Sequence, residues 1–151
     1  DSIKKFGILS VEKLKEKGIR YYHNDEDRFD EQLGGISVSI TSRNNHLFKK
    51  FQARNTRRWV EVEINPEVVV KKNCLFYDCN ASNTKFRDMP EEYLSSFDAF
   101  DGMFAESVAS TKRTIKRMNK ELNQTTDDQA EIIVKWMIPK TQIFGWRDID
   151  V

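Results

Sequence analysis

The chain has 151 residues and is 38% hydrophobic, which suits one globular domain with a sizeable core. Charged residues make up 32% of it, with 25 Lys and Arg against 24 Asp and Glu. The net charge of the whole chain therefore gives no sign of nucleic-acid binding. No apolar run reaches membrane-spanning length and no signal-peptide segment opens the chain, so we expect a cytoplasmic protein without a membrane partner.

Short helices and strands alternate along the first part of the chain. A helix ending at Gly7 and another over 11–17, stopped by Gly18, are predicted first. Alternating apolar and polar residues over 36–41 then predict a half-buried strand, and 44–55 a short helix.

The middle of the chain continues this order. A strand is expected over 57–64, with Val60, Val62 and Ile64 facing inward and Trp59, Glu61 and Glu63 outward. A helix is expected to start at 65–67, a strand over 74–78 and a polar turn after it. Three phenylalanines at helical spacing are expected to be core residues of one helix: Phe97, Phe100 and Phe104.

Five basic residues cluster at helical spacing before the last apolar run. They fit either a solvated helix face or a surface that follows nucleic-acid phosphates, and both interpretations stay open. The residues are Lys112, Arg113, Lys116, Arg117 and Lys120.

The apolar run over 127–138 contains one glutamate near its start. With a period of two residues, Ala130, Ile132 and Val134 share a core face, and Glu131 lies on the other face with Ile133. Glu131 is therefore expected in a partly covered cleft, although the strand pattern alone is more typical of a solvated glutamate.

The number and spacing of the cysteines and histidines argue against a metal site and against disulfides. A tetrahedral zinc site would need Cys74, Cys79, His23 and His46 to converge without paired ligand spacing, so no metal site is predicted. We expect both cysteines to be reduced, partly buried thiols. The order of elements indicates an α+β fold with mainly antiparallel strand pairing.

Four stretches resemble, in the same order, the DarT family of nucleic-acid ADP-ribosyltransferases. They are DRFDEQLGGISVSITSRNNHLFKKF, WVEVEINPEVV, CLFYDCNAS and QAEIIV. The resemblance implies an ADP-ribosyltransferase-like fold, in which a split antiparallel β-sheet with short flanking helices holds NAD. It further implies transfer of ADP-ribose from NAD to a base of single-stranded DNA. The implied setting is a toxin-antitoxin or phage-defence system with a macrodomain-type antitoxin.

The resemblance also implies roles for individual residues. Glu131 in QAEIIV matches the family's catalytic glutamate, and Arg28 in DRFD matches the arginine placed before the first central strand. Asn80 in CNAS matches a polar position facing the cleft, and Leu9 matches the turn beside bound NAD. Breaking the bond to nicotinamide builds positive charge on the ribose, which a carboxylate such as that of Glu131 would stabilise. Arg28 would stabilise negative charge on the base, since a guanidinium does not deprotonate.

The sequence departs from the family pattern in two places. The family opens with a histidine-bearing strand that grips NAD, and Asp1 falls just after where that strand should lie. We therefore expect residues 1–151 to be one domain whose histidine strand precedes Asp1. The stretch from Glu61 to Glu63 mimics paired catalytic glutamates, but its strand alternation favours a structural role. The alternatives are the same chemistry on RNA, or a non-catalytic module that binds nucleic acid or an antitoxin.

Overall fold

The computed structural model describes residues 2–21, 34–53, 58–110 and 113–149. The chain divides into two compact units, and the second consists of Ser37–His46 and Cys74–Ile133. The first consists of Asp1–Ile36, Leu47–Asn73 and Val134–Val151. Short helices and small antiparallel sheets alternate along the chain, which confirms the predicted α+β class. The prediction of a single domain over residues 1–151 stays a prediction.

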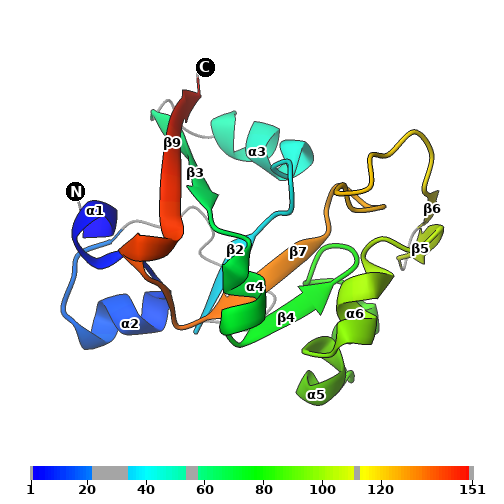
Figure 1. Cartoon of the computed structure of the whole chain (residues 1–151), viewed down its shortest axis with the longest axis horizontal. Coiled ribbons are helices and arrows are strands. Elements are labelled where there is room, and N and C mark those ends of the chain that lie inside the picture. The colour runs from blue at the N-terminus through cyan, green and yellow to red at the C-terminus, as the bar shows by residue number, and fades with distance from the viewer. Residues whose placement is uncertain (1, 22–33, 54–57, 111–112, 150–151) are drawn as a thin grey trace. The chain divides into compact units, whose positions relative to one another are not determined.

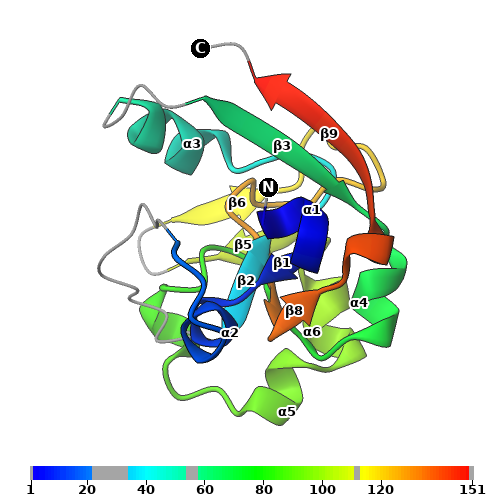
Figure 2. The same cartoon turned by 90° about the vertical axis from the view of Figure 1, so that its left-hand side faces the viewer.

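Several elements lie wholly in the first unit (Figures 1 and 2). The helices are α1 (Ser2–Phe6), α2 (Val11–Glu16), α4 (Glu67–Lys71) and the 3-10 helix η2 (Lys140–Gln142). The strands are β1 (Ile8–Leu9), β3 (Trp59–Ile64), β8 (Met137–Ile138) and β9 (Ile143–Ile149). Three further elements contain residues of both units: β2 (Gly35–Val38), α3 (Asn45–Gln52) and β7 (Glu131–Lys135).

A tight turn at Gly7 joins α1 to β1, which pairs antiparallel with β8. Gly7 has a φ of +80°, and a Cβ there would lie 2.2 Å from the carbonyl oxygen of Ile138. Only glycine suits both the left-handed backbone and this close approach. After the turn, Ser10 caps α2 because its Oγ accepts a hydrogen bond from the Lys13 N–H at 3.3 Å.

The longest pairing joins β3 and β9 into an antiparallel ribbon, seen in Figure 1 as the green and red strands. The predicted facing of β3 is wrong at two positions. Trp59 packs edge-on against Phe48 of α3 with ring centroids 5.4 Å apart, whereas Val60 is 44% exposed. Burying the larger indole against a helix removes more apolar surface from water than burying a valine would.

The second unit contains the remaining elements and a well-buried core. They are β4 (Cys74–Tyr77), η1 (Thr84–Phe86), α5 (Glu91–Leu94), α6 (Phe97–Gly102), β5 (Ser107–Ala109) and β6 (Thr114–Lys116). The strands β2, β7 and β4 form a sheet in that order. The core cluster consists of Leu75, Tyr77, Cys79, Ala81, Phe86, Leu94, Val108 and Ile133.

The phenylalanine prediction holds only in part. α6 ends at Gly102, so Phe104 lies beyond the helix, where its ring still contacts that of Phe100 at 5.4 Å. Phe97 is 75% exposed, so its assignment to the core is wrong. A six-residue helix is too short for all three side chains to share one buried face.

The basic segment is a hairpin and loop rather than the helix that its spacing suggested. β5 and β6 pair antiparallel, with Val108 opposite Ile115 and Ala109 opposite Thr114. The β-branched residues Val108, Thr114 and Ile115 favour an extended backbone, and Val108 is buried in the core. Tertiary packing of these side chains therefore overrides the helical spacing of the charges.

Among the described residues, Cys74 and Cys79 are buried and form no disulfide, which agrees with the predicted reduced thiols. Burial raises the pKa of Cys74 to about 11. Burial also raises the pKa of Cys79 to about 12, with a smaller opposing effect from Lys85. Both thiols therefore stay protonated at neutral pH and are poor nucleophiles.

Candidate active site

Glu131 is the first residue of β7 and directly precedes a buried apolar segment. The three residues that follow it, Ile132, Ile133 and Val134, are almost fully buried, whereas Glu131 itself is half-buried. Burial of these side chains fixes the strand, and the strand fixes where the Glu131 carboxylate lies. The expectation of a partly covered glutamate is thus met.

Within the described ranges, two hydrogen-bond donors hold the Glu131 carboxylate. The Ala81 N–H donates to Oε1 at 2.7 Å, and the Ser37 Oγ donates to Oε2 at 2.5 Å. These donors come from the loop after β4 and from β2, which flank β7 in the sheet. Each carboxylate oxygen can accept more than one hydrogen bond, so an oriented Glu131 can still accept from a substrate hydroxyl.

Asn80 shapes the loop that presents the Ala81 N–H. Its Oδ1 accepts hydrogen bonds from the Ser82 N–H at 3.0 Å and from the Ser82 hydroxyl. This local turn is the type that asparagine side chains favour. Asn80 therefore directly precedes Ala81, whose N–H binds Glu131, and the Asn80 side-chain oxygen holds the loop.

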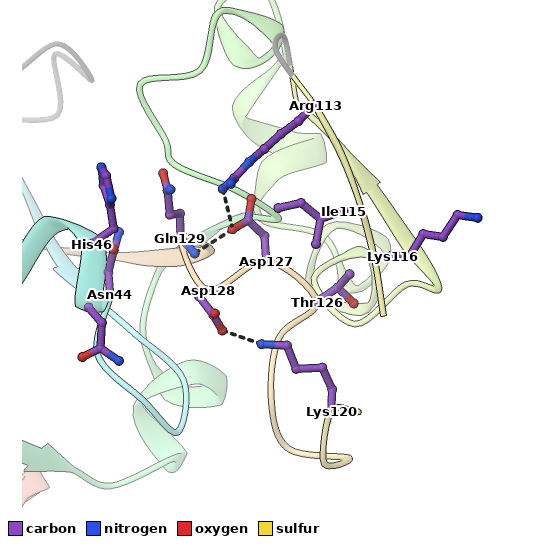
Figure 3. A pocket seen from close by; sticks show the side chains of 11 residues that line it. Asn44, His46, Arg113, Ile115, Lys116, Lys120, Thr126, Asp127, Asp128 and Gln129 are labelled. Carbon is purple, nitrogen blue, oxygen red and sulfur yellow. Dashed lines mark hydrogen bonds and ion pairs between the residues drawn. The ribbon is translucent and has the colours of Figure 1, made fainter. Parts of the chain in front are cut away.

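A pocket of about 340 Å³ lies in the second unit, beside the loop that leads into Glu131 (Figure 3). Residues from three segments line it. They are Asn44, Asn45, His46, Arg113, Ile115, Lys116, Lys120, Thr126, Asp127, Asp128 and Gln129.

Asp127 is a buried charged residue of this pocket, with only 3% of its side chain exposed. Its Oδ1 accepts a hydrogen bond from the Gln129 N–H at 2.9 Å and lies 3.7 Å from the Arg113 guanidinium. Its main-chain carbonyl oxygen accepts from the Thr125 hydroxyl at 2.8 Å and from the Ala130 N–H at 3.0 Å. These bonds fix the turn that enters β7 at Glu131.

The predicted basic residues divide into two groups. Arg113, Lys116 and Lys120 line the pocket, although Figure 3 shows Lys116 extending away from Asp127. Lys120 pairs with Asp128 at 2.5 Å. Lys112 lies outside the described residues.

Arg117 has a different, structural role. Its guanidinium donates to the carbonyl oxygens of Gln124 and Glu121 at 2.8 Å each, and to the Thr126 hydroxyl at 3.2 Å. It also lies over the Phe104 ring, 5.9 Å from the centroid. Arg117 therefore braces the loop from Glu121 to Thr126 and does not line the pocket.

The other predicted site residues are not brought to Glu131 by any described contact. Leu9 lies in β1 of the first unit, opposite Met137 of β8. Arg28 lies outside the described residues. Their predicted roles therefore stay predictions.

Sequence reasoning missed both donors to Glu131. Ser37 belongs to the polar face of an alternating strand, which gives it no chemical signature of its own. The Ala81 donor is a main-chain N–H, which no side-chain motif can encode.

Metal-binding clusters and membrane-spanning helices are both absent from residues 2–21, 34–53, 58–110 and 113–149. In those ranges, no group of three or more His, Cys, Asp or Glu side chains could hold a metal ion. Among the helices within the same ranges, none is both long enough and apolar enough to cross a membrane.

The comparisons with known proteins point to one family. The model of the family described as "ssDNA thymidine ADP-ribosyltransferase, DarT" matches residues 3–145 of the 151. The match includes Glu131, Ser37 and the loop at Ala81. A search of curated proteins found no match.

Proposed function

The chain belongs to the DarT family of single-stranded-DNA thymidine ADP-ribosyltransferases, and we propose that Glu131 is the catalytic carboxylate of that reaction here. Members of the family take ADP-ribose from NAD. The observation that carries the proposal is the pair of donors, Ala81 and Ser37, that orient both oxygens of a half-buried carboxylate at the start of β7.

The residues fit the chemistry that the reaction requires. Transfer breaks the bond between the ribose C1′ and nicotinamide, forms a bond from C1′ to a ring nitrogen of thymine, and releases the proton of that nitrogen. Glu131 accepts a hydrogen bond from a ribose hydroxyl and places its negative charge against the cationic sugar. The donors on its two oxygens keep that charge in place, so little reorganisation is needed during the reaction.

The remaining predicted residues complete the proposal. Arg28 stabilises the negative charge that develops on the base, and Leu9 and Asn80 border the NAD site. The basic residues Lys112, Arg113, Lys116 and Lys120 follow the phosphates of the DNA strand. Arg117, which braces a loop, is left out of the phosphate contacts.

The biological setting is part of the same proposal. We propose that the protein acts as a toxin of a toxin-antitoxin or phage-defence system, with a macrodomain-type antitoxin as its partner. Its predicted place of action is the cytoplasm, where NAD and DNA are both present.

Incubation with adenylate-labelled NAD and single-stranded oligonucleotides tests the enzymatic role. The protein, produced with its natural N-terminus, should label an oligonucleotide with one thymidine, and not the same oligonucleotide with cytidine in its place. Glu131→Gln should lower the labelling rate about 10²–10³-fold while an unchanged circular dichroism spectrum reports an intact fold. Labelling of RNA alone would favour the RNA alternative. Binding of DNA without any labelling would favour the non-catalytic module.

A further inference from the structure

We propose that Thr41 is a positioning residue of the transfer reaction, because it holds the loop between β6 and β7 in shape before the DNA strand binds. This loop, residues 117–130, leads directly into β7. The inference rests on the proposed function and adds to it a residue that acts on the DNA through the loop.

Thr41 has a strained backbone conformation. Its φ is +61°, and the Ser42 N–H donates a hydrogen bond to the Ile40 carbonyl oxygen at 2.6 Å. A bond between residues two apart, around a central residue with positive φ, is the mark of the γ-turn that is rare and strained. A β-branched residue is especially unfavourable there, and glycine would be the least strained choice. A threonine at this position is therefore expected to supply an interaction that glycine cannot.

The Thr41 hydroxyl supplies such an interaction. It donates a hydrogen bond to the main-chain carbonyl oxygen of Asn123 at 2.5 Å, from 82 positions away in the sequence. Both residues belong to the second unit, Thr41 shortly after β2 and Asn123 in the loop between β6 and β7. The strained turn thus directs a side chain of one segment at the backbone of the other.

Side chains hold the tip of this loop through its carbonyl oxygens. Arg117 donates to those of Glu121 and Gln124 from the base of the loop. Thr41 donates to that of Asn123, between these two, from outside the loop. The two donors therefore grip one short turn from different segments of the chain.

The tip buries little apolar surface that could replace these hydrogen bonds. Residues 121–123 are all exposed, and Leu122 is 94% exposed. A segment with few buried apolar contacts opens readily when its hydrogen bonds are removed. Loss of the Thr41 hydroxyl should therefore loosen the tip and leave the core of the second unit intact.

The loop carries a basic residue that the proposed function assigns to the DNA phosphates. Lys120 directly precedes the tip, lines the pocket of Figure 3 and pairs with Asp128 at 2.5 Å. A loop that already has its binding shape loses less entropy when the strand binds, which favours affinity. Thr41 should therefore act mainly on the KM for DNA, with little effect on kcat or on the KM for NAD.

Three substitutions at Thr41 separate its hydroxyl from its backbone strain. Thr41→Val removes the hydroxyl and keeps the β-branched shape, Thr41→Ser keeps the hydroxyl, and Thr41→Gly removes the hydroxyl but suits a positive φ. In labelling assays on the protein with its natural N-terminus, the KM for DNA should rise about three- to tenfold in Thr41→Val and in Thr41→Gly. Thr41→Ser should stay within about twofold of the parent, and the KM for NAD should not change in any of the three.

Thermal unfolding distinguishes positioning of the loop from a purely structural role. Thr41→Gly should melt about 2–4 °C above Thr41→Val, because its backbone is relaxed, and yet have the same raised KM for DNA. A KM for DNA that follows the melting temperature across the variants would make Thr41 a structural residue and overturn the inference.

Thr141→Val is the matched control, at an exposed threonine of η2 in the first unit. It should leave the KM for DNA at the value of the parent. An equal KM for DNA in Thr41→Val and Thr141→Val would overturn the inference.

DNA binding measured without NAD separates this inference from the proposed function. Fluorescence anisotropy of a labelled single-stranded oligonucleotide should rank the variants in the same order as the KM for DNA. Weaker binding by Thr41→Val than by Thr41→Ser, with no labelling of any oligonucleotide by the parent, would contradict the proposed enzyme and still support the role of Thr41. Labelling of thymidine with one KM for DNA in all variants would support the enzyme and overturn that role.

Discussion

The main-chain N–H of Ala81 donates a hydrogen bond to Oε1 of Glu131 at 2.7 Å, across 50 positions of sequence. Every residue except proline would keep this donor at position 81. The loop that presents it follows a strand whose four residues are all buried. Ser37 completes the arrangement from the other side of β7. The orientation of the carboxylate thus depends on three neighbouring strands of one sheet.

Ser37→Ala removes the hydroxyl donor to Glu131 Oε2. Because that hydroxyl is exposed, we expect a modest fall in kcat for ADP-ribose transfer, about five- to tenfold. The free energy of unfolding should change little. Initial rates with labelled NAD measure the effect, and Ser39→Ala, an exposed serine of the same segment, is the matched control. Equal rates for the two variants would show that Ser37 has no positioning role.

Asn80→Ala removes the side chain that organises the loop at Ala81. The Ala81 N–H would then be less firmly directed at Glu131, and we expect kcat to fall about tenfold. Asn83→Ala is the control, because Asn83 makes a similar bond to the Lys85 N–H at 3.1 Å but starts η1 instead. A loss of stability is expected from both variants, and a loss of kcat only from Asn80→Ala.

Sequence patterns predicted the local elements well where one physical signal dominated. Gly7 and Gly18 marked the ends of α1 and α2, and the apolar run of β4 marked a buried strand. The patterns failed where tertiary packing competed with them, as at Trp59, which packs on Phe48, and in the hairpin around Ile115. A helix or strand of few residues gives only a weak periodic pattern in the sequence.

Of the groups at the Glu131 carboxylate, only the carboxylate itself was predicted from the sequence. The proposed catalytic glutamate could be named from QAEIIV because that stretch resembles the family's motif. Its two donors could not, since a serine hydroxyl and a main-chain N–H are common groups that gain a role only through strand order. The burial of Asp127 could not be predicted either, because Asp127 and Asp128 are adjacent and identical in sequence. Only the structure shows that the first is buried and the second exposed.

Arg117 and Lys116 should respond differently to substitution. Arg117→Ala removes three hydrogen bonds to the loop over 121–126, so we expect the free energy of unfolding to fall by about 2–4 kcal/mol. Lys116→Ala should change it by less than about 0.5 kcal/mol. Urea denaturation measures both.

Binding to single-stranded DNA gives the complementary result for the same two residues. Lys116→Ala should weaken binding and reduce the slope of log affinity against log salt by about 0.7, as expected for one lost phosphate contact. An unchanged slope would remove Lys116 from the phosphate-binding surface. Arg117→Ala should leave the slope unchanged under conditions in which the variant is folded.

Three glycines offer a graded test of backbone strain. Gly7→Ala adds a Cβ at a φ of +80° and against the Ile138 carbonyl oxygen, so a loss of about 2–4 kcal/mol is expected. At Gly18 the φ is +61° and nothing lies within 4 Å, which leaves a strain of about 1 kcal/mol. Gly102→Ala, at the last residue of α6 and with nothing within 4 Å, should be neutral or slightly stabilising. Any other order of the three unfolding free energies would contradict the assigned φ angles.

Stability should fall at alkaline pH through the two buried thiols. Burial raises the pKa of Cys74 to about 11 and of Cys79 to about 12, from 9.0. Between pH 9 and 12 the unfolded chain loses thiol protons that the folded chain keeps, so the free energy of unfolding decreases as pH rises. Below pH 9 both states hold these protons, and this source of pH dependence disappears.

The double variant Cys74→Ala, Cys79→Ala isolates the thiols from the lysines and tyrosines that titrate in the same window. We expect the variant to be less stable than the parent at pH 7, since two buried side chains are shortened. Its unfolding free energy should nevertheless decline less steeply from pH 9 to 10.5 than that of the parent, in urea denaturation series at fixed ionic strength. Parallel declines in the two proteins would mean that neither thiol is held protonated by burial.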